Sequence, residues 1–341
     1  MGPTAGGNRP RKTTKIALCV VLAAMVVLAV ISYSPLRTLS SLRKADDYPL
    51  YVMSYHGGYL SEPFLNLAIP EDIPHQVNAL AKSDACTCFA ALNPEGEKIF
   101  GRNFDWYRHP SLLLFTDPPN AYASVSMVDI HYLGYGMEDP SLVGRTRLLL
   151  APYLPFDGMN EAGLVVGMMA VPYARASDDF EKPTMGSLRA IRLLLDHAAS
   201  VDEALSLLEE YNIVFHGPPL HYLISDSSGE SAVVEFVDGK TNVVRNDREW
   251  QVATNFIISA ALPDGANAPC SRYNRAYEAL EQARASVSEE QATAILESGA
   301  QPHTIWSAVY DISGGDVQLV VGGNYERVHT FELQKGETPT R

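Results

Sequence analysis

Cysteine is scarce in this chain, and the four cysteines present form no metal-binding pattern. Cys86-Thr87-Cys88 lacks the second cysteine pair or the nearby histidine pair that a structural zinc site needs. The nine histidines are scattered without ligand spacing, and neither a G-x-G-x-x-G fingerprint nor a Walker loop occurs. We therefore expect no metal and no cofactor.

Basic residues are also scarce over most of the chain. From Cys86 onward there are 34 acidic against 18 basic residues, and the formal net charge of all 341 residues is −14. Binding to nucleic acid needs a basic face, so this excess of acid argues against a nucleic acid partner. The charge is that of a solvated surface and does not identify a substrate.

Acidic residues are absent from the first 44 positions, which contain seven Arg and Lys residues. Ile16 to Ile31 is an uncharged apolar run that follows a basic stretch at 9–15. As a helix this run covers ~24 Å, slightly less than a ~30 Å hydrocarbon core. It fits a signal peptide or a signal anchor, and the lack of a clear A-x-A cleavage site favours the anchor. We expect an exported protein, located at the cell membrane or outside the cytoplasm.

Composition divides the chain into four parts. These are a signal peptide or signal anchor over 1–33, a linker and further segment over 34–85, one globular domain over 86–333, and a polar tail over 334–341. Residues 34–47 have the polar character of a linker, and Tyr48 to Tyr59 is the most strand-like stretch ahead of the globular domain.

Strands and helices are expected in alternating blocks. The patterns predict strands over 86–92, 98–104, 163–171, 221–225, 231–236, 250–254, 306–311, 317–322 and 328–333, and helices over 186–199, 200–211, 271–285 and 288–297. Ser200 to Glu203 and Ser288 to Gln291 are capping boxes that begin two of the helices. Blocks in this order favour an α+β sandwich with antiparallel sheets over a βαβ array.

The turn Asn93–Gly96 places a thiol beside charged residues. A hairpin centred on this turn pairs positions whose numbers sum to about 189, so Cys86 faces Asn103, with Arg102 and Asp105 within reach. A cation near a thiol favours the thiolate, which is the reactive form of cysteine. The pattern predicts a reactive thiol at one end of the hairpin, although Arg102 and Asp105 also fit a plain ion pair.

Three cysteines lie beyond the N-terminal apolar run, so at most one disulfide forms among them and a thiol is left free. Cys86 is the candidate nucleophile, and an inert buried thiol is the alternative. Cys88 lies on the same strand face as Cys86 and is a rival, which we expect to belong to the core. We expect Cys270 to be structural.

These residues resemble the choloylglycine hydrolase and penicillin V acylase family of N-terminal-nucleophile amidases, and its isopenicillin N acyltransferase-like branch. The matching segments occur in order: Cys86-Thr87, Phe100 to Trp106, Asp157 to Leu164, Ala253-Thr254-Asn255, Ser271-Arg272-Tyr273 and Thr304 to Ser307. Each segment alone is weak, but the ordered set covers most of the chain after residue 85. The resemblance implies a four-layer αββα sandwich, preceded here by an N-terminal hydrophobic helix.

The resemblance also implies that Cys86 becomes the first residue of the mature chain. A free α-amine has a pKa of ~7.7–8.0 and is a suitable general base at neutral pH. Because 85 residues precede Cys86, the Ala85–Cys86 bond must be cut, and residues 34–85 then include a pro-segment. Such a cut disconnects the enzyme from an N-terminal anchor unless residues 48–85 stay bound.

The family pattern implies roles for six residues. Cys86 is the nucleophile, Arg102 and Asp105 position its terminus, Asn255 and Asn160 contribute to the oxyanion hole, and Arg272 orders the site. Without the pattern, Asn160 and Asn255 are ordinary turn or strand-end residues.

We therefore expect a hydrolase that cleaves a linear amide C–N bond of a small molecule through a Cys86 acyl-thioester. An acyltransferase that passes the acyl group to an amine shares the first half-reaction and is the alternative. A catalytically inactive, membrane-anchored binding protein on the same fold is the alternative from another class. The expected partners are the small-molecule amide and the membrane, through the N-terminal segment. Homo-oligomerisation is an open alternative, since several relatives assemble.

Overall fold

The computed structural model describes residues 33–59, 86–176, 179, 181–261 and 268–333. The apolar run Ile16 to Ile31, the Ala85 side of the expected cleavage site and the polar tail lie outside these ranges. Within the ranges, no helix is both long enough and apolar enough to cross a membrane.

The larger of two main sheets has nine strands in the order β1-β2-β5-β6-β7-β8-β11-β12-β13. Their bounds are β1 Arg43–Asp46, β2 Leu50–His56, β5 Ser111–Asp117, β6 Ser124–Asp129, β7 Pro155–Asn160, β8 Val165–Ala170, β11 Leu220–Ser225, β12 Ser231–Val237 and β13 Lys240–Arg245. All neighbours pair antiparallel except β2 and β5, which are parallel. β5 to β8 and β11 are buried almost throughout, as expected for strands covered on both faces.

The second sheet has six strands in the order β14-β3-β4-β15-β16-β17, all paired antiparallel. Their bounds are β3 Thr87–Leu92, β4 Lys98–Asp105, β14 Gln251–Ala253, β15 Thr304–Asp311, β16 Asp316–Val321 and β17 His329–Glu332. β9 (Thr184–Gly186) and β10 (Asn212–Val214) form a separate parallel pair.

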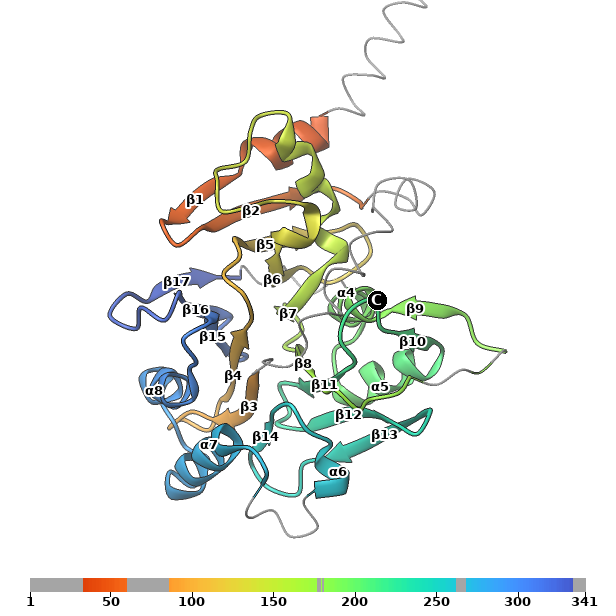
Figure 1. The fold of residues 1–341 in the computed structure, drawn as a ribbon, viewed down its shortest axis with the longest axis vertical. Coiled ribbons are helices and arrows are strands. Elements are labelled where there is room, and N and C mark those ends of the chain that lie inside the picture. The colour runs from red at the N-terminus through yellow and green to blue at the C-terminus, as the bar shows by residue number, and fades with distance from the viewer. Residues whose placement is uncertain (1–32, 60–85, 177–178, 180, 262–267, 334–341) are drawn as a thin grey trace, which may run out of the picture.

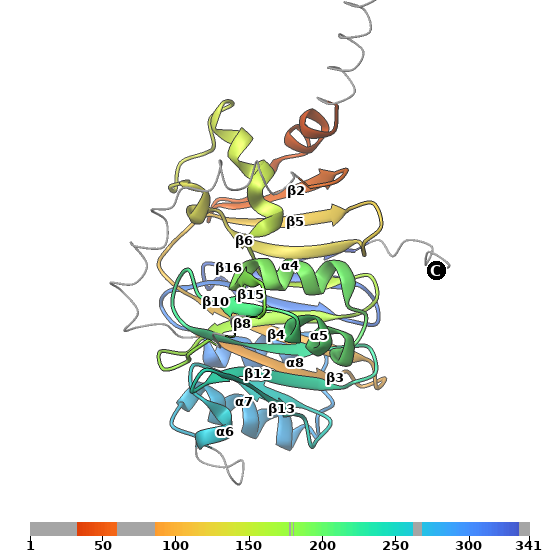
Figure 2. The ribbon, with the colours of Figure 1, turned by 90° about the vertical axis from the view of Figure 1, so that its right-hand side faces the viewer.

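Helices cover the outer faces of the two sheets, which pack against each other (Figures 1 and 2). α4 (Ser187–His197) and α5 (Val201–Glu209) lie on the nine-stranded sheet, and α7 (Ser271–Gln282) and α8 (Glu289–Gly299) lie on the six-stranded sheet. The short elements are α6 Ile258–Ala261, η1 Ile130–Leu133 and η2 Gly144–Tyr153. The expected α+β sandwich of four layers, with mostly antiparallel sheets, is therefore confirmed.

The predicted capping boxes differ in how completely they form. At α8, the Ser288 hydroxyl accepts from the Gln291 backbone N–H and the Gln291 side chain accepts from the Ser288 N–H, so the box is complete. At α5, the Ser200 hydroxyl accepts from the Glu203 N–H, but the Glu203 carboxylate accepts from the Ala199 N–H instead. Both serines begin their helices as the sequence predicts.

The segment ahead of Cys86 is the main departure from the predicted layout. Residues 34–47 do not form a linker, because 33–40 are helical and Arg43–Asp46 is the edge strand β1. β1 is short and polar, which is how exposed sheet edges are commonly protected, and this character concealed it in the sequence. β2, at the position of the strand-like stretch, lies inside the sheet between β1 and β5.

Candidate active site

The β3–β4 hairpin presents Cys86 and Arg102 to the interior between the sheets, but its register differs from the predicted one. Cys88 pairs with Arg102 and Thr87 with Asn103, so paired numbers sum to 190 rather than 189. The turn is one residue longer than expected, since the Asn93 N–H donates to the Glu97 carbonyl at 2.7 Å. Asn103 therefore faces Thr87, and not Cys86, across the hairpin.

Two residues from distant segments hold the backbone of Cys86. Its N–H donates to Oδ1 of Asn255 at 2.5 Å, and its carbonyl accepts from Nη1 of Arg272 at 2.5 Å. Arg272 Nη2 also donates to Asn255 Oδ1 at 3.1 Å, so the three residues form a closed set. Asn255 follows β14, and Arg272 is in the first turn of α7. The predicted site residues Cys86, Asn255 and Arg272 are thus brought together.

Arg102 is fully buried and lies against both thiols of the hairpin. Burial alone would lower the pKa of Arg102. The pKa is instead raised by the nearby side chains of Cys86, Cys88 and Asp157, so the guanidinium keeps its charge. Burial raises the pKa of Cys88 to about 12, and Arg102 opposes this only in part. Cys88 is therefore a neutral thiol at ordinary pH, consistent with its expected place in the core.

Asp157, on β7, fixes Arg102 from the opposite sheet and was not predicted as a site residue. The Arg102 Nε donates to Asp157 Oδ2 at 3.3 Å, and both side chains are fully buried. Trp306 Nε1 donates to the same oxygen at 3.0 Å, and the Tyr310 hydroxyl donates to Oδ1. An acidic residue that is buried in a strand needs a buried cation as its partner. The position of Asp157 among apolar neighbours was the signal in the sequence for such an ion pair.

Asp105 is fully buried at the end of β4, where its Oδ1 accepts from the Thr304 hydroxyl. Its Oδ2 has no hydrogen-bond partner among the residues that the structure describes. Burial raises the pKa of Asp105 to about 6. The hydrogen bond from Thr304 and the charges of Arg272 and Arg102 lower this pKa, but burial outweighs them. The carboxyl therefore lies within the field of both arginines, with one oxygen available to a further donor.

Asn160 is placed away from this group, contrary to the expected role. Its Nδ2 donates to the carbonyls of Leu195 and Ala198 at the end of α4, and its Oδ1 accepts from the Leu164 N–H. Asn255 Nδ2 instead donates to the carbonyl of Ala170, at the far end of β8 from Leu164. Six residues at ~3.3 Å each put these ends roughly 20 Å apart, so Asn160 cannot serve an oxyanion at Cys86.

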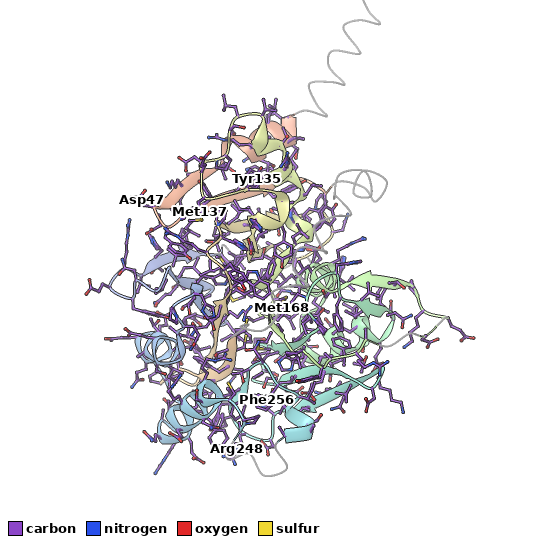
Figure 3. The ribbon with its side chains drawn as sticks, in the orientation of Figure 1. Asp47, Tyr135, Met137, Met168, Arg248 and Phe256 are labelled. Carbon is purple, nitrogen blue, oxygen red and sulfur yellow. The ribbon has the colours of Figure 1, made fainter. Side chains whose placement is uncertain are left out.

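The loop that carries Asn255 is anchored from β12. Glu235 is fully buried there, and it accepts from the Ile258 N–H at 2.5 Å and from the Ser259 N–H at 3.3 Å. Phe256, next to Asn255, packs edge-on against Tyr273 of α7. Figure 3 shows Phe256 toward the α6 and α7 end of the molecule and Met168 of β8 near its centre. Tertiary contacts therefore fix the position of Asn255.

The cluster combines a cysteine, two arginines, a buried acid and an amide. A thiol beside a permanent cation can act as a nucleophile, and amide and guanidinium N–H groups can stabilise a developing negative charge. In the part of the chain that the structure describes, no group of three or more His, Cys, Asp or Glu side chains could hold a metal ion.

Comparison with known proteins identifies a family whose sequence pattern this chain matches. The model of the linear amide C-N hydrolases of the choloylglycine hydrolase family matches residues 86–256, beginning at Cys86 itself. The penicillin V acylase of Pectobacterium atrosepticum is 27% identical over 192 residues, covering 51% of this chain and 50% of the relative. The chain thus spans about half the length of this curated relative.

Solved structures share the fold. A mutant conjugated bile acid hydrolase from Clostridium perfringens matches with a TM-score of 0.57 at 20% identity, covering 74% of this chain and 93% of that one. The penicillin V acylase from Agrobacterium tumefaciens matches with a TM-score of 0.51 at 22% identity, covering 73% and 86%. At these identities the likeness concerns the arrangement of the sheets and helices.

Proposed function

Because the chain belongs to the choloylglycine hydrolase family of linear amide C-N hydrolases, we propose that it hydrolyses a linear amide in a small molecule with Cys86 as nucleophile. One observation carries the proposal. The backbone of Cys86 is held by Asn255 and Arg272, while Arg102 lies against its thiol. An inert core cysteine needs no such surroundings.

The proposed activity requires that the Ala85–Cys86 bond be cut first. In the step we propose, the Cys86 sulfur attacks the Ala85 carbonyl carbon and the thiol proton passes to the peptide nitrogen. The peptide C–N bond then breaks, and the nitrogen leaves as the α-amine. Water then hydrolyses the resulting thioester, which gives the Ala85 carboxylate and regenerates the thiol. The contact from the Cys86 nitrogen to Asn255 Oδ1 supports this, because the new amine would keep the same acceptor.

The new amine would then act as the general base for substrate. It takes the proton from the thiol as sulfur attacks the substrate carbonyl, and it returns the proton to the leaving amine. Asp105, with one free oxygen, holds the amine in this scheme. Arg102 stabilises the thiolate through its retained charge.

The developing oxyanion would be met by Asn255. Its Nδ2 carries two N–H groups, of which one donates to Ala170, and the second is offered to the oxyanion. Arg272 positions Asn255 by donating to its Oδ1. Removal of an oxyanion donor typically costs ~10²–10³ in turnover, and we expect a loss of that size for Asn255→Ala.

The family and the names of the relatives support a proposal for the substrate class. The similar proteins are described as acting on conjugated bile acids and on penicillin V. We propose a small-molecule amide for this chain as well. A test panel of a conjugated bile acid, penicillin V and a fatty-acid amide spans distinct acyl groups.

We propose that the protein acts outside the cytoplasm, at the membrane. The basic stretch followed by the apolar run Ile16 to Ile31 supports this location. Exposure of membrane-bound protein to an external protease in intact cells tests it, and full protection of the catalytic part would contradict it.

Intact mass and N-terminal sequencing of the purified protein test the proposed chemistry. We expect a chain that starts at Cys86 in the wild type and an uncut chain in Cys86→Ala. Hydrolysis of the panel should release free acid. Acyl transfer to an added amine would instead identify an acyltransferase, and an uncut, inactive wild type would favour a binding protein.

Substitution of the two neighbouring cysteines provides a matched pair. Cys86→Ser should lose amidase activity by on the order of 10³-fold or more, because a hydroxyl is a far weaker nucleophile than a thiol. Cys88→Ser should keep it, because that thiol is neutral and buried in the core. The reverse result would assign the nucleophile to Cys88.

A further inference from the structure

Two strands of the large sheet come from the part of the chain ahead of the proposed cleavage site. β2 pairs with β5 in parallel over seven residue pairs, from Leu50 with Ser111 to His56 with Asp117. β1 pairs with the other side of β2. In Figure 1 these strands form the end of the sheet above β5 and β6. They are built into the catalytic domain and do not lie beside it.

β2 is buried on both of its faces. Leu50 and Val52 belong to the main core between the sheets, whereas Tyr51, Met53 and Tyr55 belong to a second core cluster. Each of the five side chains is at most 5% exposed. The second cluster is completed by residues after Cys86, on β5, β6, η1 and η2 and in the loop between η1 and η2. Figure 3 shows one of them, Tyr135, beside the β1–β2 end.

Polar contacts join the same two parts of the chain at several places. The Tyr51 hydroxyl donates to Asp139 Oδ1 at 2.6 Å, and Pro49 O accepts from the Ser111 N–H at 2.8 Å. The Asp46 carboxylate forms an ion pair with Arg327 and a hydrogen-bond contact with Nε2 of His329, both beyond β16. These contacts reach both the nine-stranded sheet and the end of the six-stranded sheet.

Tyr59, at the C-terminal end of the segment 33–59, also contacts the rest of the domain. Tyr59 donates through its hydroxyl to Asp196 Oδ1 at 3.2 Å, and its ring lies 5.6 Å from the Arg192 guanidinium carbon. Arg192 in turn forms an ion pair with Asp196 at 2.8 Å. The segment 33–59 is therefore attached to the catalytic domain at β1, along β2 and at its C-terminal end.

We propose that residues 33–59 stay bound after the Ala85–Cys86 bond is cut, so that the mature enzyme consists of two chains. This rests on the proposed function, because it presupposes the cut. The cut removes one covalent link and none of the contacts described above. What opposes retention is the freedom gained by separated fragments, and an interface formed like a domain core outweighs it.

Retention has a consequence for location. The apolar run Ile16 to Ile31 is on the same fragment as β1 and β2. Where that run is kept as an anchor, maturation does not release the enzyme from the membrane, and the strand pair is the link between anchor and active site.

The test uses the full chain with Cys86→Ala, which cannot cut itself, and a recognition sequence for a specific protease introduced within 60–85. The protein is kept in detergent, and a denaturing gel first establishes that the added protease has cut it. Native mass spectrometry and size-exclusion chromatography should then find both fragments in one species, which separates only in denaturant. Separation under native conditions would overturn the proposal.

Two variants of the same chain identify what holds the fragment. Met53→Asp, which places a charge in the second core cluster, should release the fragment once the chain is cut. Tyr33→Ser changes a side chain that is 65% exposed and should leave the fragment bound. Retention in Met53→Asp would overturn the role given to β2. If that variant does not fold, the cut Cys86→Ala chain alone decides whether the fragment is retained.

Failure of this inference is distinguishable from failure of the proposed function. The engineered cut does not depend on Cys86, so retention is measured whether or not the natural cut occurs. The natural cut is measured separately, from the mass of the wild-type chain.

Discussion

At the scale of single residues, the candidate site depends on buried charges that lie outside the Cys86 motif. Arg102 is held between the two thiols and Asp157, and Asp105 is buried nearby with a single accepted hydrogen bond. Groups of this kind couple the chemistry of the site to the stability of the fold, because each is costly to bury without its partner.

Removal of the Asp157 charge should destabilise the protein. In Asp157→Asn the Arg102 guanidinium loses its counter-charge in a fully buried position, and such a loss costs about 3–5 kcal/mol. Urea unfolding of Cys86→Ala with and without this change measures the difference. Glu281→Gln, which breaks the exposed pair with Arg248, is the control and should cost under about 1 kcal/mol. Equal losses in the two variants would contradict the buried pair.

Asp105 should make the uncut protein less stable as the pH rises. Burial raises the Asp105 pKa from the usual 3.8 to about 6, so the folded state holds this proton more tightly than the unfolded state. The stabilisation is complete below pH 3.8 and is lost as the pH rises through about 6, for a total of at most about 3 kcal/mol.

Urea unfolding at several pH values between 4 and 7 checks this prediction. It compares Cys86→Ala with Cys86→Ala carrying Asp105→Asn, since the amide has no such titration. The free energy of unfolding of Cys86→Ala, relative to that of the variant that also carries Asp105→Asn, should fall as the pH rises from 4 to 7. A constant difference would show that Asp105 has an ordinary pKa in the folded chain.

At the scale of elements, the β3–β4 hairpin positions Cys86 through close contact between its strands. Gly101 pairs with Phe89, and a Cβ added at Gly101 would lie 2.3 Å from the Phe89 ring. Phe89 is fully buried, so its ring has no free space to move into. The ring therefore packs on the bare backbone of the facing strand and fixes the spacing of the hairpin.

Gly101→Ala should destabilise the protein by about 1–3 kcal/mol through overpacking. Thermal unfolding measures the loss. Gly136→Ala is a matched control, because a Cβ there meets nothing within 4 Å and its backbone is not in the left-handed region. A Gly101→Ala protein as stable as the control would show that Phe89 can shift without cost.

At the scale of the whole molecule, the folded domain does not begin at Cys86. Without β1 and β2, the edge of β5 and one side of the second core cluster would face solvent. Burial of Leu50, Val52 and Met53 alone corresponds to roughly 6 kcal/mol, which is comparable to the whole stability of a typical domain.

A chain that starts at Cys86 should therefore be insoluble or unfolded when it is expressed alone. Co-expression with residues 33–59 should restore a soluble, folded protein, as judged by circular dichroism and size-exclusion chromatography. A stable, soluble 86–341 chain would show that the strand pair is dispensable for the fold.

The sequence by itself predicted most of the elements after residue 85 and singled out Cys86 as the candidate nucleophile. Capping serines, apolar periodicity and turn residues are local signals, and the helices α4, α5, α7 and α8 agree with them. So do nine strands, which are β3, β4, β8, β11, β12 and β14 to β17, whereas β5, β6, β7, β9, β10 and β13 were not predicted. The ordered motifs also identified the family. These features depend on neighbours in the chain, which is why a pattern can reveal them.

Only the tertiary structure decided which distant residues meet at Cys86. A turn one residue longer shifted the hairpin register, and the position of β7 in the sheet brought Asp157 to Arg102 while it placed Asn160 at the remote end. The parallel pairing of β2 with β5 likewise joined the strand-like stretch ahead of Cys86 to the core. Strand order and register depend on contacts between segments far apart in the chain, and local patterns do not encode which segments those are.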